Sequence, residues 1–406
     1  MEACADMDIY VVKYGDSIDR IANELGVDAE TLIYDNQLVY PYELAVGQAL
    51  LVNRYTRNAS GSISTGGYAY PFINSWVLEQ TLPFLSELYV FSYGFTAQGE
   101  LLPPAYGEDD WMIAEALRFG TRPVLTLTPF DENGNFNNQL IHSVVNNQDY
   151  GKHLISNLLQ TMYGKGYQGV DIDFEYILAE DRDAFTAFVW QVAETMRANG
   201  FHTSVALAPK TSSDQPGLLY EGKDYRALGE AADHVLLMTY EWGYTYGPPM
   251  AVAPIPQVRQ VVEYALTQIP SYKINLGIPN YGYDWPLPFV RGETRARTIG
   301  NIEAVRIAIA NGAVIQFDEL SQSPFFFYTA LENGSVVYPE EQAFAALVEG
   351  TGYSREHEVW FEDVRSLQTK FDLIREYDLR GCGYWQIMQW FRANWLLLVY
   401  QFYILK

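Results

Sequence analysis

The segment Gly169–Glu175 reads Gly-Val-Asp-Ile-Asp-Phe-Glu, and it constrains the fold of this chain more than any other segment. Side chains alternate between the two faces of a strand, so Asp171, Asp173 and Glu175 are predicted to share one face. The other face is entirely apolar, as expected for a strand that helices cover. Burying unpaired charge is costly, so three carboxylates inside a core indicate a purpose other than stability.

Like charges held close together raise the pKa of one carboxyl group and leave a neighbour ionised. A protein can obtain a general acid at neutral pH in this way. The alternative is a solvent-exposed edge strand or first helical turn that happens to be acidic. The apolar opposite face and the turn-forming entry Gly166-Tyr167-Gln168-Gly169 favour the buried strand.

The composition restricts the partners. A net charge of −24 repels phosphate backbones, so nucleic acid is not expected as a partner. No Lys/Arg cluster is available to bind an anionic membrane surface. Aromatic residues make up 15 % of the chain, which suits both a large core and a groove that stacks on sugars. The five histidines have no metal-ligand spacing, so neither a metal nor another cofactor is predicted; they are His142, His153, His202, His234 and His357.

The chain shows no signature of an exported or membrane-spanning protein. Its start lacks the basic and apolar regions of a signal peptide. Cys4 and Cys382 lie at opposite ends, and no disulfide is expected between them. The longest apolar run, Trp395–Tyr403, is about half of the roughly 20 residues that a membrane span requires. It predicts a last helix packed on a core.

Composition divides the chain into a small first segment, a linker and a large second segment. In the first, Ile9–Val12 and Gly47–Val52 are predicted strands, and the helices between them are Ile18–Leu25 and one that begins at Asp28. Residues 53–67 are rich in Ser, Gly, Asn and Thr and have the composition of a linker.

The predicted β-α-α-β segment at residues 8–52 resembles a LysM domain. The matching residues are Tyr10–Ser17, Ile21-Ala22, Asn36 and Leu44–Leu50. The resemblance implies binding of glycans that contain N-acetylglucosamine. It places the contacts in the loop after the first strand, at Gly15, Asp16 and Ser17, and in the loop Leu38–Pro41 after the second helix. The alternative is a small structural cap or dimerisation unit.

The large segment, residues 68–406, alternates strands with helices such as Asp183–Asn199 and Pro256–Gln268, which predicts a (β/α)₈ barrel of the TIM type. A long interval before the last strand, at about residues 286–365, predicts a small α+β insertion that forms one wall of a groove. Sites in this architecture lie at the carboxyl ends of the strands, where Glu175 is expected. The eight predicted strands are Tyr68–Ile73, Leu88–Phe95, Val124–Thr128, Gly169–Glu175, Thr203–Ala208, Val235–Tyr240, Ile274–Ile278 and Gly383–Met388.

Four separated motifs resemble glycoside hydrolase family 18. Gly169–Glu175 is similar to the family's Asp-x-x-Asp-x-Asp-x-Glu strand, and Met238–Glu241 to its Met-x-Tyr-Asp strand end. Leu276–Gly282 and Gly383–Trp385 are similar to its seventh and eighth strands. The sequence departs from the pattern at Gln168, where the family has its first Asp, and at Glu241, where it has Asp.

The resemblance implies a substrate-assisted mechanism, which is an exception to the two-carboxylate scheme. Glu175 would protonate the glycosidic oxygen, and the substrate's acetamido oxygen would attack carbon 1. Asp173 would orient the acetamide and stabilise the cationic intermediate, with Asp171 sharing a proton behind it. Tyr240 would donate to the acetamide oxygen, unless it is a core tyrosine with a satisfied hydroxyl.

Trp385 is expected to form the apolar floor under the reacting sugar, although an ordinary core position is the alternative. Further substrate contacts are expected at the mouth of the barrel, from Glu241, Asn280, Tyr281 and Tyr93.

Within the family, the chain is most similar to the spore cortex-lytic branch, through Tyr167–Tyr176, Ser323–Phe326 and Val359–Asp363. That branch implies an N-acetylglucosaminidase that acts on cortex peptidoglycan fragments and is deposited in spore coat or cortex. Two alternatives stay open: a chitinase, and a non-catalytic glycan-binding protein of the spore coat. We expect the chain to be a monomer.

Overall fold

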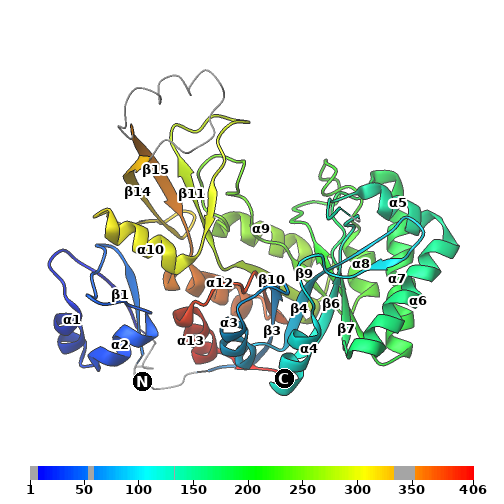
Figure 1. The fold of residues 1–406 in the computed structure, drawn as a ribbon, viewed down its shortest axis with the longest axis horizontal. Coiled ribbons are helices and arrows are strands. Elements are labelled where there is room, and N and C mark those ends of the chain that lie inside the picture. The colour runs from blue at the N-terminus through cyan, green and yellow to red at the C-terminus, as the bar shows by residue number, and fades with distance from the viewer. Residues whose placement is uncertain (1–7, 54–58, 132, 333–352) are drawn as a thin grey trace.

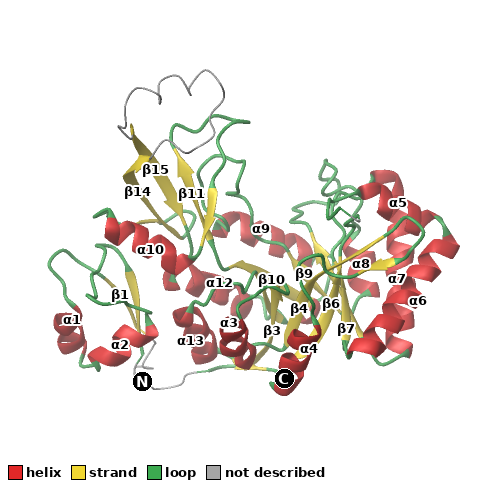
Figure 2. Ribbon diagram, in the orientation of Figure 1, coloured by secondary structure: helices red, strands yellow, loops and turns green. Residues whose placement is uncertain are grey.

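The computed structural model describes residues 8–53, 59–131, 133–332 and 353–406. Figure 1 shows a small N-terminal domain in blue beside a central barrel, with an insertion in yellow and orange above it. Figure 2 shows that helices surround the strands of the barrel. Within the described part of the chain, none of the helices combines the length and apolar character needed to cross a bilayer.

The N-terminal domain has the predicted β-α-α-β order. Strand β1 (Asp8–Val11) pairs antiparallel with β2 (Ala49–Val52), and helices α1 (Ile18–Leu25) and α2 (Ala29–Asp35) lie between them in the chain. The side chains of Ser17 and Asp28 cap the two helices, because each accepts a hydrogen bond from a backbone N–H of the first turn.

Eight parallel strands close into a barrel, which confirms the predicted fold class. Their order is β3-β16-β10-β9-β8-β7-β6-β4, and pairing of β3 with β4 closes the circle. The strands are β3 (Ser62–Ala69), β4 (Glu87–Phe95), β6 (Arg122–Leu127), β7 (Gly169–Ile172), β8 (His202–Leu207), β9 (His234–Leu237), β10 (Ile274–Pro279) and β16 (Gly381–Trp385).

Helices and short strands complete the barrel. Strand β5 (Leu101–Leu102) pairs antiparallel with β4, and β17 (Tyr403–Ile404) pairs parallel with β3. The 3₁₀ turns are η1 (Leu82–Phe84), η2 (Ala179–Asp181) and η3 (Ser271–Lys273). The helices are α3 (Ser75–Thr81), α4 (Asp110–Arg118), α5 (Asn138–Asn146), α6 (Gln148–Lys165), α7 (Arg182–Ala198), α8 (Tyr225–Ala231), α9 (Ile255–Leu266), α12 (Val364–Glu376) and α13 (Arg392–Gln401).

The insertion between β10 and β16 is an antiparallel sheet with one described helix, α10 (Asn301–Ala310). Its first strand begins at Gly282, shortly after β10 ends at Pro279, so the insertion is longer at its start than the predicted range 286–365. Its strand order is β12-β11-β15-β14-β13. These strands are β11 (Gly282–Pro286), β12 (Arg297–Ile299), β13 (Gln316–Asp318), β14 (Ser323–Glu332) and β15 (Tyr353–Trp360).

The first barrel strand corrects the predicted linker. Strand β3 begins at Ser62, inside the range 53–67 that its composition assigned to a linker. Its small residues are required by packing: a Cβ at Gly66 would lie 2.4 Å from the ring of Tyr89, and one at Gly67 would lie 2.8 Å from Ile387. Sequence composition alone does not distinguish such a strand from a flexible segment.

The N-terminal domain is docked against the barrel and the insertion. The guanidinium of Arg392 at the start of α13 donates to Asp35 at 2.9 Å and lies 4.1 Å from the ring centre of Tyr34. On the other side, the backbone N–H of Ile315 donates to the carbonyl of Val46 at 2.9 Å. These contacts join α2 and the loop before β2 to two separate parts of the large segment.

A cavity of about 470 Å³ lies in this interface. The loop Leu38–Pro41, which the LysM resemblance assigned to glycan binding, forms part of one wall, and α10 forms part of the other. The loop is therefore shared between the domain and the insertion.

Gly47 gives a direct test of the docking. A Cβ at Gly47 would lie 1.8 Å from the carbonyl oxygen of Ile315, so we expect Gly47→Ala to separate the N-terminal domain from the insertion. Small-angle X-ray scattering should show a larger radius of gyration, and proteolysis between the domains should be faster. Gly26→Ala is the matched control, because Gly26 also has positive φ but has nothing within 4 Å. Equal scattering from both variants and the wild type would contradict the docking.

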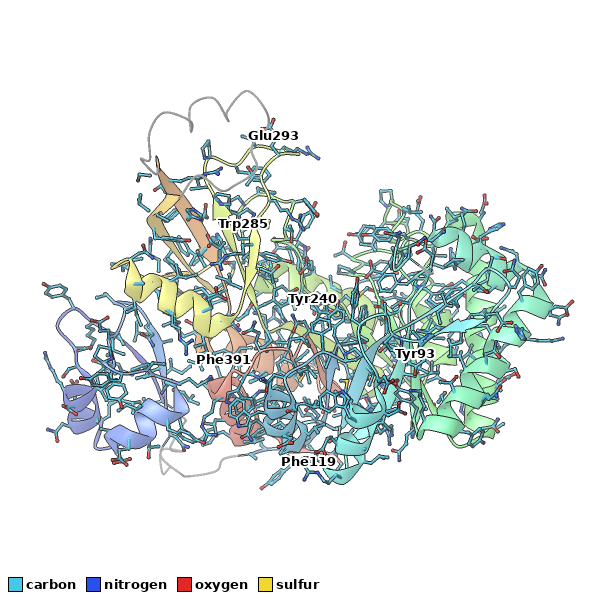
Figure 3. All side chains as sticks on the ribbon, viewed as in Figure 1. Tyr93, Phe119, Tyr240, Trp285, Glu293 and Phe391 are labelled. Carbon is cyan, nitrogen blue, oxygen red and sulfur yellow. The ribbon has the colours of Figure 1, made fainter. Side chains whose placement is uncertain are left out.

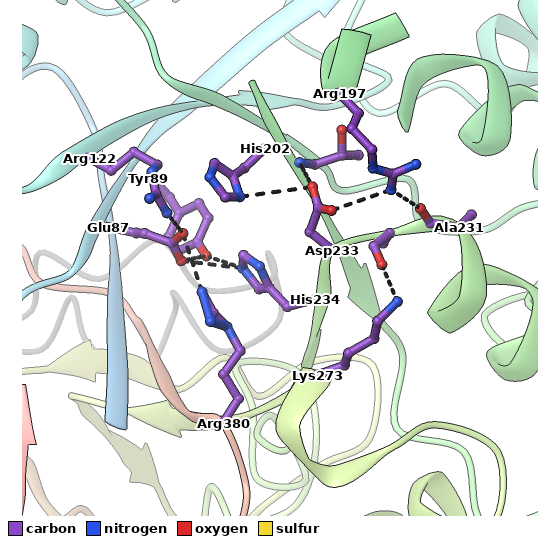
Figure 4. A network of polar contacts seen from close by, with 12 residues as sticks. Glu87, Tyr89, Arg122, Arg197, His202, Ala231, Asp233, His234, Lys273 and Arg380 are labelled. Atoms are coloured by element: carbon purple, nitrogen blue, oxygen red, sulfur yellow. Dashed lines mark hydrogen bonds and ion pairs between the residues drawn. The ribbon is translucent and has the colours of Figure 1, made fainter. Parts of the chain in front are cut away.

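A buried ionic network closes the bottom of the barrel, at the amino ends of its strands (Figure 4). Glu87 on β4 accepts from Arg122 at 2.8 Å and lies 3.3 Å from His234 and 3.5 Å from Arg380. The hydroxyl of Tyr89 donates to the other Glu87 oxygen at 2.9 Å. In TIM barrels, residues at this end of the barrel contribute to stability, and the catalytic residues lie at the opposite end.

Candidate active site

The predicted acidic motif lies at the carboxyl end of β7. The strand ends at Ile172, three residues before Glu175, although the N–H of Asp173 still donates to the carbonyl of Leu127 at 3.0 Å. Phe174 packs on the outside of the barrel, stacked on Phe95 at 5.3 Å between ring centres. Glu175 is thus placed at the mouth of the barrel on a segment that its neighbours anchor in the core.

Asp171 is fully buried inside the barrel. Its carboxylate accepts from the hydroxyl of Tyr68 at 2.8 Å and from that of Ser204 at 2.6 Å. Burial raises the pKa of Asp171, and the two hydrogen bonds only partly oppose this. The nearest departure from the family motif, Gln168, lies exposed at the other end of β7 and takes no part in this cluster.

Asp173 lies next in the direction of the mouth and is also buried. Its Oδ1 atom has no hydrogen-bond partner within the described residues. Burial, followed by the charges of Glu175 and Asp171, raises the pKa of Asp173 well above its ordinary value. A buried carboxylate oxygen without a partner is costly unless another molecule supplies the donor.

Glu175 is half-buried at the end of this series. Burial raises the pKa of its carboxyl group, and the nearby ammonium of Lys223 opposes the rise. Asp173 and Glu175 therefore form a coupled pair in which one proton is retained at higher pH than either group alone would allow. The sequence predicts an acid–base role for these two carboxyl groups.

Lys223 is the main site feature that sequence reasoning missed. It lies in the segment between β8 and α8 and is 1 % exposed. A single lysine in the run Glu-Gly-Lys-Asp looks like an ordinary surface loop residue, and no spacing in the sequence connects it with the carboxylates.

Tyr240 follows β9 and is buried beside the carboxylates; Figure 3 labels it near the centre of the molecule. It packs closely on β10, since a Cβ at Gly277 would lie 2.8 Å from the Tyr240 ring. Burial raises the pKa of Tyr240 well above its ordinary value, and the negative charges of Asp173 and Glu175 raise it further. The hydroxyl is therefore a donor and not a phenolate.

Trp385 is the last residue of β16 and is half-buried at the barrel mouth. Its ring meets those of Phe91 at 4.8 Å and Tyr68 at 5.6 Å, edge to face in both cases. Asn280 is not free to bind a substrate through its amide N–H groups, because they donate to the carbonyls of Gln386 and Gln389. Asn280 instead holds the segment that follows Trp385.

A series of aromatic rings continues outward from Trp385. Its ring centre lies 6.3 Å from that of Tyr70, which stacks on Phe72 at 5.1 Å. Phe72 in turn meets Tyr106 at 6.3 Å. Phe72 is 61 % exposed and Tyr106 67 % exposed, so both rings present apolar area to solvent beside the site.

Glu241 has a left-handed backbone, with φ of 67°, at the barrel mouth. Its carboxylate accepts from the hydroxyls of Tyr281 and Tyr283. Burial of the carboxylate raises the pKa of Glu241, and these hydrogen bonds partly oppose the rise. Both Glu241 and Tyr281 are predicted substrate contacts. Tyr281 is buried and orients Glu241, so only Glu241 is exposed at the barrel mouth.

The prediction that Tyr93 contacts substrate is wrong. The register between β4 and β6 shifts between Val90 and Tyr93, which turns the Tyr93 side chain out of the barrel. Its hydroxyl donates to Asp109 at 2.6 Å, and its ring packs edge to face on Tyr167. Figure 3 shows Tyr93 well away from Tyr240.

The predicted LysM residues shape their own loops. Gly15 has φ of 81°, and Asp16 accepts from the hydroxyl of Tyr10 and from the N–H of Lys13, each at 2.8 Å. Ser17 caps α1, and Leu38 packs on the small core of the domain.

Within the described ranges, no group of three or more His, Cys, Asp or Glu side chains is arranged to hold a metal ion. Cys382 is a buried free thiol, and Cys4 lies outside the described residues.

A closed (β/α)₈ barrel with carboxyl groups gathered at the carboxyl end of a strand has the architecture of a barrel enzyme. Comparison of the sequence with family models makes this specific. The model for glycosyl hydrolases family 18 matches residues 133–389, and the LysM domain model matches residues 10–53. The chain belongs to glycosyl hydrolases family 18 and carries a LysM domain. It is a glycosidase.

Full-length relatives share both parts. The cortical fragment-lytic enzyme of Bacillus subtilis is 38 % identical over 98 % of this chain and 99 % of its own length. The crystal structure of the spore cortex-lytic enzyme SleL of Bacillus megaterium is similar with a TM-score of 0.86, at 32 % identity over 98 % of both chains. That of the Bacillus cereus spore cortex-lytic enzyme SleL has a TM-score of 0.76, at 35 % identity over 98 % of this chain and 87 % of that one.

Proposed function

We propose that this protein hydrolyses the β-1,4 bond after N-acetylglucosamine in peptidoglycan fragments of the spore cortex, with retention of configuration. The observation that carries the proposal is the pair at the mouth: a half-buried Glu175 beside a buried Asp173 whose Oδ1 lacks a partner. An acetamido N–H is a donor of the right kind for that oxygen. Substrates without an acetamido group would leave it unpaired, and they are therefore poor substrates.

The reaction proceeds in two steps. Glu175 gives its proton to the glycosidic oxygen while the acetamido oxygen of the same sugar attacks carbon 1, so the C–O bond to the leaving group breaks as a new C–O bond forms. The oxazolinium ion that results is cationic, and the carboxylate of Asp173 stabilises it. Glu175, now ionised, takes a proton from water as that water attacks carbon 1 and reopens the ring.

Tyr240 donates to the acetamido oxygen and aligns it for attack. Trp385 supplies the apolar surface under the reacting sugar, and the exposed rings of Phe72 and Tyr106 extend an apolar surface for the neighbouring sugars. Glu241, held by Tyr281, accepts from sugar hydroxyl groups at the mouth.

Three similar proteins support the cortex as the source of the substrate and the spore as the site of action, because their names state lysis of cortex or cortical fragments. The chain matches them over most of their lengths. The LysM domain would hold the enzyme on the same N-acetylglucosamine-containing glycan through the loops at Gly15–Ser17 and Leu38–Pro41.

Product analysis tests the proposal. The full chain is incubated with spore cortex fragments and, separately, with chitin oligosaccharides, and the products are identified by mass spectrometry and by the sugar at the reducing end. We expect new N-acetylglucosamine reducing ends from cortex fragments and little or no product from chitin. Cleavage of chitin alone would establish a chitinase instead. The absence of product from both would support a glycan-binding protein without catalytic activity.

A further inference from the structure

Lys223 is a buried lysine whose segment packs beside the segment of the proposed catalytic pair. Its ammonium donates to the carbonyl of Ala206 at 3.2 Å. Ala206 directly follows Val205, which pairs with Ile172 on β7, so Ala206 lies at the level of Asp173 on the adjacent strand. Neighbouring strands are about 4.8 Å apart. The ammonium is therefore held where β8 runs beside the carboxylates.

The segment that carries Lys223 is fixed against the segment that carries the acid. Gly222 packs on Ile177, two residues after Glu175, so closely that a Cβ at Gly222 would lie 2.5 Å from the Cβ of Ile177. The N–H of Lys223 donates to the carbonyl of Tyr220 at 3.1 Å, and its own carbonyl accepts from the ammonium of Lys210 at 3.0 Å. The position of the charge is thus built into the fold.

Burying an ammonium group is costly unless negative charge compensates it. Burial lowers the pKa of Lys223, and the negative charges of Glu175, Asp173 and Asp171, in that order, oppose the fall. An ammonium has three N–H donors, and the described residues account for one of them, at Ala206. The Oδ1 atom of Asp173 also has no partner within the described residues, so the cluster contains both unused donors and an unused acceptor.

We propose that Lys223 is a positioning residue whose charge sets the pH range in which Glu175 holds and releases its proton. The inference rests on the proposed role of Glu175 as acid and base. When Glu175 gives up its proton, the cluster gains a negative charge beside Asp173, and the ammonium stabilises that state. Without Lys223, Glu175 would keep its proton to higher pH and would be a weaker acid.

Other charged or titratable groups face the cluster from the surrounding strands, and they differ from Lys223. Tyr240 and Glu241 follow β9, and Tyr68 on β3 hydrogen-bonds Asp171. Glu87 and His234 act on Asp171 from the bottom of the barrel. Among these groups, Lys223 alone acts as a cation on both Glu175 and Asp173.

The test compares Lys223→Met, which keeps length but removes charge, with Lys223→Arg, which keeps charge. Glutamate is labelled with ¹³C in the full chain, the carboxyl signal of Glu175 is assigned by its loss in Glu175→Gln, and the signal is titrated. We expect Lys223→Met to move the titration of Glu175 to higher pH by about one unit, and Lys223→Arg to remain near the wild type. The basic limb of kcat/KM against pH on cortex fragments should move in the same direction.

Lys273→Met is the matched control, since it removes an ammonium that also donates to backbone carbonyls, those of Gly229 and Ala232, and that has no contact with the Lys223 segment among the described residues. It should lower the melting temperature without moving the Glu175 titration. The inference is overturned if Lys223→Met leaves the titration unchanged, or if Lys273→Met moves it equally. The titration needs no substrate, so an enzyme that fails to cleave cortex fragments would refute the proposed function and still decide the role of Lys223.

Discussion

Replacing Glu175 by Gln should lower turnover by about 10²–10⁴-fold, the usual contribution of a positioned general acid. Glutamine keeps the size of the side chain and removes the transferable proton. Because Glu175 makes no hydrogen bond that holds the described fold together, the variant should fold and melt like the wild type. Turnover on cortex fragments and binding of the same fragments by calorimetry separate the two effects: kcat should fall while the dissociation constant changes little.

Glu180→Gln is the matched control, since Glu180 is exposed in η2, five residues further along the chain. It should leave kcat unchanged. A Glu175→Gln variant with wild-type turnover would remove Glu175 as the acid. Loss of binding together with turnover would instead assign Glu175 to substrate affinity.

The wild type should also lose activity as pH rises, because the acid must be protonated. Burial raises the pKa of Glu175 from its ordinary value, so the protonated form persists to higher pH than for an exposed glutamate.

The sequence predicts much of this architecture, because period-two and helical patterns fix strands and helices wherever one face is buried. The helix Ile18–Leu25 has the predicted bounds, and Phe174 lies on the apolar face opposite the carboxylates, as predicted. The start of strand β3 was assigned to a linker because the sequence there is rich in glycine. Those glycines pack closely on Tyr89 and Ile387, and these contacts exist only in the closed barrel.

Site residues that are close together in the sequence could be predicted from it. Site residues that the fold brings together from distant segments could not. Asp171 lies on β7, and Asp173 and Glu175 lie on the segment that directly continues it, so alternation along the chain groups the three carboxylates. Lys223 enters from a segment about fifty residues later, and Tyr93 leaves the barrel interior through a register shift. Neither effect has a signature in the sequence.

Loss of the Glu87 carboxylate should have the largest effect on stability. The side chain of Glu87 is completely buried. Its carboxylate oxygens accept hydrogen bonds from Arg122 and Tyr89, and His234 and Arg380 lie nearby. Glu87→Gln would leave the partly buried guanidinium groups of Arg122 and Arg380 without their buried counter-charge, and breaking a buried ion pair costs up to about 3–5 kcal/mol. We expect this loss in the free energy of unfolding at neutral pH, measured by denaturant titration.

The pH dependence distinguishes loss of charge from loss of packing. Burial alone would raise the pKa of Glu87, but the charges of His234, Arg380 and Arg122 hold it well below its ordinary value. A depressed pKa contributes stability above the pKa of the unfolded chain, and that stability is lost as pH falls through the folded value. The difference in the free energy of unfolding between the wild type and Glu87→Gln should therefore be largest at neutral pH and decrease on acidification.

Glu376→Gln is the control, because it breaks an exposed ion pair with Arg259 that solvent screens. It should lower the free energy of unfolding much less at every pH. If the difference in the free energy of unfolding between the wild type and Glu87→Gln does not change with pH, the effect of Glu87 is due to side-chain packing and not to its charge.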